Sequence, residues 1–307
     1  MGDVYCTYFD HNYLARALLT IRSLRLYDTS TRIYILALSD LCETVMRELA
    51  LPNVEIIPLP MLEQAYPELA ALKLERTRME YYFTLTPFLP HYVFAATPAD
   101  RVTYLDMDLY FFSSPKPMLD SLGQASVAIT PHRFSFEYRE HFIFGLFNVA
   151  WITYRRCAEG LDCLNSYKAD CTSWCHDRLE DGRFGDQKYL DSWPQRYSSL
   201  RIIEHKGINL APWNVDNYDL RMKNQKLMVD GEPLVFYHFS GMGTRPDASA
   251  DTYVATRPGA GRDVLIRHVV KPYLRRLENQ RANLHQRFPA LAPAEVEIRY
   301  ECRKDSA

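Results

Sequence analysis

Long apolar runs are absent from this sequence. No uninterrupted stretch reaches the roughly 18 apolar residues of a membrane-spanning helix, so we expect no transmembrane segment. The first residues show no basic region followed by a long apolar stretch, so we expect no secretory signal peptide either. Both absences favour a cytoplasmic protein whose cysteines are reduced.

An excess of charge of one sign is also missing. The formal net charge is only −2, which gives no reason to expect nucleic acid as a partner. The seven cysteines lack regular spacing, and only Cys171 and Cys175 form a close cluster. A structural zinc would need a second pair of ligands at matching spacing, which Cys157 and Cys163 supply poorly. No repeat, low-complexity tract or interdomain linker is visible, which favours a single domain.

The first half of the chain alternates strand and helix patterns. Short apolar runs predict strands at residues 4–9, 33–38, 54–58, 102–105, 127–130, 148–154, 201–204 and 234–239. Apolar residues at helical spacing predict helices at residues 12–27, 40–51, 72–89, 187–193 and 262–287. The helix at residues 72–89 is expected to end near its two prolines. Strands that alternate with helices predict an α/β fold with a parallel or mixed sheet flanked by helices.

The most informative segment reads RVTYLDMDLYFFSSP, at residues 101–115. An apolar run delivers Asp106 and Asp108 to the carboxyl end of a predicted strand, where open α/β sheets bind ligands. Residues two apart on an extended chain point to opposite faces, so the two carboxylates share one site only if the strand ends or bends there. Such a pair suits Mg²⁺ or Mn²⁺ shared with a diphosphate. The alternative is an Asp-rich turn, which the apolar residues before it and the aromatic residues after it disfavour.

His238 is also expected to emerge at the end of a strand, after the apolar residues 234–237. A lone histidine in this setting is commonly a satisfied core residue. Gly241 close behind it favours a site, because glycine lets backbone N–H groups approach phosphate oxygens. With Asp106 and Asp108, His238 would complete the ligands of a cation that neutralises a departing diphosphate.

Asp186 and Gln187 follow a glycine-rich turn and begin a predicted short helix. One interpretation is that they only cap the helix. The other places both against the anomeric carbon of a sugar, where Gln187 would stabilise an oxocarbenium-like transition state. A covalent role for Gln187 is less favoured, because an amide oxygen is a weaker nucleophile than a carboxylate.

Two more polar segments have two interpretations each. Lys73, Arg76 and Arg78 would form a solvated helix face, or Arg76 or Arg78 would reach a donor phosphate or a sugar hydroxyl, as the family resemblance described next implies. Residues 209–214, NLAPWN, would form a surface for stacking on a sugar, or a packed turn.

Several segments, in order along residues 3–245, resemble those of the retaining family 8 glycosyltransferases, which include lipopolysaccharide galactosyltransferases and glycogenin-like enzymes. They are VYCTYFDHNY at 4–13 (base-binding strand and loop), YLDMDLY at 104–110 (metal-binding strand), FNVA at 147–150 (behind the acceptor), GDQ at 185–187 (beside the reacting sugar carbon) and HFSG at 238–241 (third metal ligand). Each motif alone is weak, but their common order makes the resemblance strong.

The resemblance implies a GT-A fold, a Rossmann-like mixed sheet that binds a nucleotide sugar. Residues 1–261 would form the catalytic domain, and residues 262–307 a C-terminal basic helix and tail of the same domain. The implied activity is metal-dependent transfer from a nucleotide sugar, a UDP-sugar, to a glycan or lipid-linked acceptor with retention of configuration. Asp186 and Gln187 would be catalytic, with the leaving phosphate as base in a front-face mechanism. The implied donor and metal contacts are Thr7, Tyr8, Asp10, Tyr13, Arg78, Asp106, Met107, Asp108, Asn148, His238, Gly241 and Arg245.

The sequence departs from the family pattern at two places, which leaves the transferred sugar open. Ala150 stands where the family usually has glycine, and Arg245 lies near the usual Lys-Pro-Trp. Arg245 would replace the lysine that faces the phosphate, with a planar fork in place of a point charge. Two alternatives to a glycosyltransferase remain. A phosphatase of the haloacid dehalogenase class also uses D-x-D, but wants Thr or Val where this chain has Tyr110. A non-catalytic nucleotide-sugar-binding protein would not need all three metal ligands.

The helix predicted at residues 262–287 is basic and amphipathic, with seven Lys or Arg residues against Asp263 and Glu278. Pro272 should kink or restart it. Such a helix would lie on an anionic membrane, on its inner face, and bring the site to a lipid-linked acceptor. The alternative is a helix packed on the core with a solvated basic face. The loop at residues 240–261 and the tail from residue 288 are expected to be loose.

Overall fold

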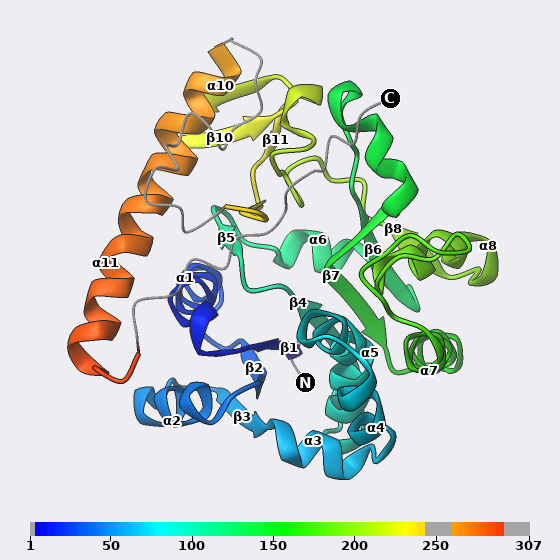
Figure 1. The fold of residues 1–307 in the computed structure, drawn as a ribbon. Helices are drawn as coiled ribbons and strands as arrows, with labels where there is room; N and C mark the ends of the chain where they lie inside the picture. The colour runs from blue at the N-terminus through cyan, green and yellow to red at the C-terminus, as the bar shows by residue number, and fades with distance from the viewer. Residues whose placement is uncertain (1–3, 243–259, 292–307) are drawn as a thin grey trace, which may run out of the picture.

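The computed structural model describes residues 4–242 and 260–291, and Figure 1 shows their arrangement. Arg245, the rest of the predicted loop at residues 243–259 and the tail at residues 292–307 lie outside the described residues.

A seven-stranded mixed sheet lies at the centre, with the strand order β3-β2-β1-β4-β7-β6-β8. Its strands are β1 (Val4–Phe9), β2 (Arg32–Ala37), β3 (Val54–Pro58), β4 (Arg101–Leu105), β6 (Val127–Pro131), β7 (Phe147–Arg155) and β8 (Leu200–Ile202). β1 runs parallel to β2 and β4, whereas β7 runs antiparallel to β4 and β6. The predicted mixed α/β sheet is therefore confirmed.

Helices cover both faces of this sheet (Figure 1). One face packs against α1 (Leu14–Arg25), α2 (Asp40–Leu49) and α11 (Lys271–Arg287), and the other against α3 (Leu59–Ala65), α4 (Glu68–Glu75), α5 (Arg78–Ala96) and α7 (Ala158–Ser173). Along β1, Tyr5 joins the first core and Cys6 the second. Because the central strands are buried on both faces, they appear in the sequence as continuous apolar runs.

The single helix predicted at residues 72–89 is wrong, because the chain forms α4 and α5 there. Thr77 caps α5 in a capping box, in which its side chain accepts from the Glu80 N–H and Glu80 accepts from the Thr77 N–H. The helix also continues past Pro87 and Pro90. An interior proline costs about 3 kcal/mol, and the burial of α5 against β1, β4 and α7 offsets that cost.

Two smaller sheets complete the fold. β5 (Leu109–Phe111) pairs antiparallel with β12 (Phe236–His238), and β9 (Leu220–Lys223), β10 (Lys226–Val229) and β11 (Glu232–Pro233) form a three-stranded sheet. The remaining short helices are α6 (Lys116–Ser121), α8 (Trp193–Arg196), η1 (His11–Tyr13), η2 (Phe136–Phe144), η3 (Gln187–Ser192) and η4 (Val215–Asn217). Sequence patterns predicted neither the three-stranded sheet nor the pairing of β5 with β12.

The C-terminal helical run comprises α10 (Ala260–Leu265), a π-helical turn (Ile266–Val270) and α11, and α11 packs against α1 (Figure 1). Val269, Tyr273 and Leu277 are buried in the core, so the apolar side expected to enter lipid is covered. This is the alternative arrangement, with a packed helix and a solvated basic face. Peripheral membrane contact stays a prediction, and it would rest on exposed basic side chains alone. The cytoplasmic location also stays a prediction. Among the described residues, no helix combines the length and apolar character needed to cross a bilayer.

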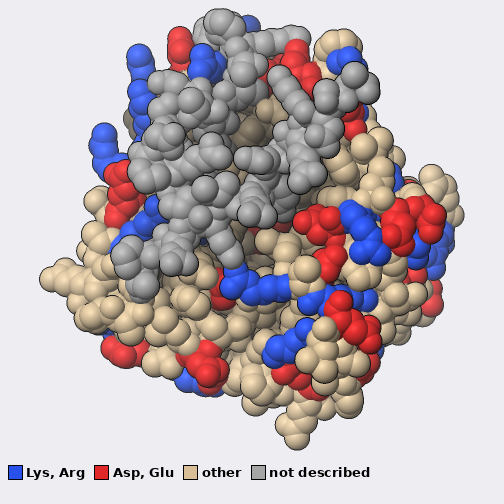
Figure 2. Space-filling view, in the orientation of Figure 1, with Lys and Arg blue, Asp and Glu red and all other residues tan. Residues whose placement is uncertain are grey.

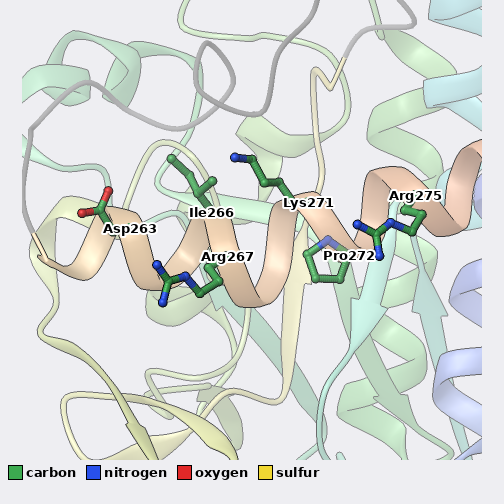
Figure 3. Close-up of a pocket in the computed structure, with 6 residues that line it drawn as sticks. All are labelled: Asp263, Ile266, Arg267, Lys271, Pro272 and Arg275. Atoms are coloured by element: carbon green, nitrogen blue, oxygen red, sulfur yellow. The ribbon is translucent and has the colours of Figure 1, made fainter.

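A cavity of about 600 Å³ lies along this helical run. Figure 3 shows its described lining, which comes entirely from the run: Asp263, Ile266, Arg267, Lys271, Pro272 and Arg275. None of the predicted site residues lines this cavity, so the cavity does not mark the candidate site. The candidate site is instead located by the positions of the predicted side chains. On the face in Figure 2, acidic and basic side chains are interspersed, in keeping with the small net charge of −2.

Candidate active site

Asp106, Asp108 and His238 meet in space although they come from distant parts of the chain. β4 ends at Leu105, so the two aspartates lie in the turn between β4 and β5. The pairing of β5 with β12 sets His238 opposite Leu109. One ligand atom from each of the three residues lies within 4.8 Å of the others. This is the one such group among the described residues, and the end of the strand lets both carboxylates share it.

The ring of His238 is held in place by contacts at both of its nitrogens. Its Nε2 lies 3.1 Å from Asp108 Oδ1, and its Nδ1 lies 3.2 Å from Asn209 Oδ1. In the tautomer whose Nδ1–H donates to the amide oxygen of Asn209, Nε2 carries the lone pair that a metal ligand needs. Asn209 has a left-handed backbone with φ 58°, and its carbonyl accepts from Asn214 Nδ2 at 2.9 Å.

The NLAPWN segment is therefore a packed turn. Asn209 and Asn214 are both buried, and both side-chain polar atoms of Asn214 and the amide oxygen of Asn209 bond within the protein. Trp213 donates from Nε1 to the His132 carbonyl, and its ring lies 5.2 Å from the His238 ring. The segment supports the metal ligand from behind.

The two aspartates differ in their electrostatic surroundings. Burial and the neighbouring Asp108 raise the pKa of Asp106 to about 7. Burial opposes ionisation of Asp108 too, but the His238 ring and then the Arg16 guanidinium outweigh it and lower the pKa of Asp108. Tyr104 Oη donates to Asp106 Oδ1 at 3.0 Å. Two crowded carboxylates and an imidazole suit a divalent cation, which would relieve their repulsion.

Metal affinity should therefore depend on pH. Asp106 must lose its proton to act as a ligand, and protons compete with the cation below its pKa of about 7. We expect the Kd for Mn²⁺, measured by calorimetry, to be about tenfold lower at pH 8 than at pH 6. Asp106→Asn should flatten this dependence as well as weaken binding. Equal affinity of the wild type at both pH values would contradict the assignment.

Asp186 and Gln187 lie at the start of η3. Asp186 is buried and makes no side-chain capping hydrogen bond, so the capping interpretation is not supported for it. Burial raises its pKa to about 6, and its charge acts on Asp106, which places the two carboxylates near each other. Gln187 donates from Nε2 to the Phe144 carbonyl at 3.0 Å, which fixes the orientation of its amide.

The predicted base-binding residues lie at the end of β1 and just after it, near these groups. Asp10 caps η1 by accepting from the Asn12 N–H at 2.9 Å. Tyr8 bonds through its hydroxyl to Thr86 Oγ1 at 2.9 Å, and its ring lies 5.6 Å from that of Tyr104. Thr7 is buried, whereas Tyr13 is partly exposed.

The remaining predicted contacts divide into structural and accessible groups. Arg76 is buried and donates to the carbonyls of Cys171 and Thr172 at 2.7 and 2.8 Å, so it is a structural residue. Arg78 is exposed at the start of α5. Gly241 has φ +69° and is exposed, whereas Met107 is buried in the core.

Asn148 is buried and contacts His132, whose Nε2 lies 3.1 Å from Asn148 Nδ2. Burial lowers the pKa of His132 to about 3, which keeps the ring neutral and its nitrogen able to accept. The ring of His132 stacks on Phe134 at 4.6 Å, and Phe134 contacts Phe142 at 5.3 Å. A continuous aromatic wall thus leads from Trp213 to the exposed segment η2.

Sequence patterns missed three supporting residues. Tyr104 and Asn209 hold metal ligands but look like ordinary strand and turn residues. Arg16 is 8% exposed in the first turn of α1, and no local pattern marks its burial. Only its contact with Met242, in the loop after β12, reveals it.

No protein-family model matches the chain. It is 30% identical over 250 residues to the uncharacterized protein YfnF of Bacillus subtilis (strain 168), a match that covers 78% of this chain and 82% of the relative. It is 26% identical over 294 residues to the uncharacterized protein YfnD of the same strain, with 94% and 93% covered.

Solved structures share the fold at low sequence identity. The galactosyltransferase LgtC, solved in complex with donor and acceptor sugar analogs, is 15% identical, with a TM-score of 0.54 and 91% of this chain and 96% of that chain covered. Mouse xyloside xylosyltransferase 1, in its apo form, is 14% identical, with a TM-score of 0.50 and 78% and 99% covered. The predicted GT-A fold is therefore confirmed.

Proposed function

The chain belongs to the same family as YfnF of Bacillus subtilis and has the GT-A fold, and we propose that it is a metal-dependent glycosyltransferase. The observation that carries the proposal is the cluster of Asp106, Asp108 and His238, with its ligand atoms within 4.8 Å, at the carboxyl end of β4. In an open α/β sheet that edge is where ligands bind.

Asp106, Asp108 and His238 would hold Mn²⁺ or Mg²⁺, which supplies charge stabilisation to a departing diphosphate. Tyr104 and Asn209 orient the ligands through their hydrogen bonds of 3.0 and 3.2 Å. The donor in this proposal is a UDP-sugar. Its base would lie by Thr7, Tyr8, Asp10 and Tyr13, and Asn148, Gly241 and Arg78 would approach the phosphates or the sugar.

The proposed chemistry retains the anomeric configuration. Gln187 would present its amide oxygen to positive charge that develops on the sugar carbon, and Asp186 would orient the sugar. The hydrogen bond of Gln187 to the Phe144 carbonyl supports this role, because a fixed amide needs no reorientation during the reaction. The acceptor in this proposal is a glycan or lipid-linked glycan that approaches along the aromatic wall, where Phe142 is 39% and Ile143 50% exposed.

Donor binding can be tested by thermal unfolding. With Mn²⁺ present, UDP or a UDP-sugar at 100 times its Kd should stabilise the folded protein by about 2.7 kcal/mol. The same ligand in excess chelator should produce a much smaller shift, because the diphosphate is bound through the cation. A screen in which no nucleoside diphosphate or nucleotide sugar shifts the melting temperature would contradict the proposal.

A further inference from the structure

Arg16 is a buried arginine that forms no close ion pair with a carboxylate among the described residues. The residue is 8% exposed, in the first turn of α1. Among the described residues it forms no ion pair within 4.0 Å, whereas the buried Arg76 donates to two backbone carbonyls. Its one hydrogen bond runs from Nη2 to the Met242 carbonyl at 2.7 Å. A guanidinium has five N–H donors, so most of its donor capacity stays unused.

The surroundings of Arg16 place it beside the metal ligands. Its guanidinium lies 4.9 Å from the centre of the Tyr13 ring, and its charge acts on Asp108 and on Tyr273 of α11. Met242, to which it donates, directly follows Gly241 in the loop after His238. Arg16 therefore stands where α1, the turn of the two aspartates and the HFSG segment meet.

Asp108 feels the charge of Arg16 but does not pair with it within 4.0 Å. The Asp108 carboxylate already faces His238 at 3.1 Å, and Arg281 lies near enough to Arg16 to add a second positive charge. A buried cation without a counter-ion is unfavourable, so its presence needs a compensating ligand. An anion that enters between Arg16 and the metal ligands would supply the missing charge.

We propose that Arg16 binds the diphosphate of the nucleotide sugar, together with a cation held by the metal ligands. This inference rests on the proposed function and adds a residue to it. A guanidinium forms two parallel hydrogen bonds to phosphate oxygens, and it keeps its charge at every physiological pH. Arg16 thereby neutralises negative charge as the sugar–phosphate bond breaks.

The test compares Arg16→Met with Arg22→Met. Both arginines lie on α1, but Arg22 is exposed and donates to Gln280 on α11, away from the metal ligands. Calorimetric titration with UDP, and with inorganic pyrophosphate as a probe without a base, is done in the presence of Mn²⁺. We expect Arg16→Met to weaken both ligands by about 10- to 100-fold and Arg22→Met by less than about twofold.

The melting temperature without ligand separates a ligand-binding role from a structural one. Methionine fills a similar volume without a buried charge, so the unliganded Arg16→Met protein should melt at the same temperature as the wild type or higher. A lower melting temperature, or unchanged affinity for UDP and pyrophosphate, would overturn the role of Arg16. If Arg16→Met does not fold, Arg16→Lys replaces it in the test. Arg16→Lys should then melt at the wild-type temperature and bind UDP about threefold to tenfold more weakly, because lysine lacks the two parallel N–H donors of the guanidinium. Any other result for Arg16→Lys would overturn the role of Arg16. Failure of the wild type to bind either ligand would instead overturn the proposed function.

Discussion

Sugar transfer by the Asp108→Ala protein should fall at least about 1000-fold, because the variant loses a metal ligand and with it several kcal/mol of charge stabilisation on the diphosphate. Asp108 is the better choice than Asp106 for this test, since its lowered pKa keeps it ionised near neutral pH. Chelator should reduce the wild type to a similar level, and added Mn²⁺ or Mg²⁺ should restore the wild type only.

A surface aspartate gives the matched control. Asp120 is exposed and pairs with Lys116 at 3.0 Å, an ion pair of the kind that contributes little to stability. Asp120→Ala should therefore keep full activity and full metal dependence. Circular dichroism should show both variants folded. An Asp108→Ala protein that remains fully active in chelator would show that no cation at this cluster takes part in the reaction.

Replacing Gln187 with alanine should lower kcat about 100-fold and change KM much less, because its proposed contact strengthens in the transition state. The amide of Gln187 also holds the Phe144 carbonyl, so part of the effect could come from a loosened η2 segment. Lys188 provides the control, since its Nζ donates to the Phe142 carbonyl at 3.3 Å in the same segment. Lys188→Ala should leave kcat within about threefold of the wild type.

Asp186→Asn should be at least as damaging as Gln187→Ala. The substitution keeps the shape of a buried side chain but removes the charge that would orient the sugar hydroxyls. Steady-state kinetics with saturating donor would measure kcat for both variants. If neither kcat changes, Asp186 and Gln187 only shape the start of η3, and the catalytic groups lie elsewhere.

The strands could be predicted because burial leaves a mark in the local sequence. The bounds of β1 and β3 agree with the apolar runs at residues 4–9 and 54–58. The break between α4 and α5 also has a local mark, the capping box of Thr77 and Glu80, which sequence reasoning overlooked. The continuation of α5 through Pro87 has none, because it depends on packing against distant strands.

The metal ligands could be predicted as a set, but their geometry could not. Asp106 and Asp108 follow an apolar run, and His238 follows another, which marks each as the end of a strand. Their meeting depends on the pairing of β5 with β12, two three-residue strands too short to carry a pattern of their own. The burial of Arg16 could not be predicted either, because a basic residue beside an apolar helix stripe ordinarily faces solvent.

The C-terminal helix shows why amphipathic character alone does not identify a membrane surface. Its apolar residues were equally compatible with lipid and with a protein core. The structure buries Val269, Tyr273 and Leu277 against the core, and Tyr273 stacks on Phe239 at 3.6 Å. What covers an apolar stripe is decided by tertiary packing, which the periodicity of one segment does not contain.

The most direct test of the account is the cleavage of nucleotide sugars by the purified protein with Mn²⁺. The account predicts release of nucleoside diphosphate from at least one UDP-sugar, faster with an acceptor glycan present, and abolished by chelator and by Asp108→Ala. A haloacid-dehalogenase-type phosphatase would instead release inorganic phosphate from p-nitrophenyl phosphate, and a binding protein would release nothing. Release of inorganic phosphate, or no cleavage of any nucleotide sugar, would contradict the claim that Asp106, Asp108 and His238 form the metal site of a glycosyltransferase.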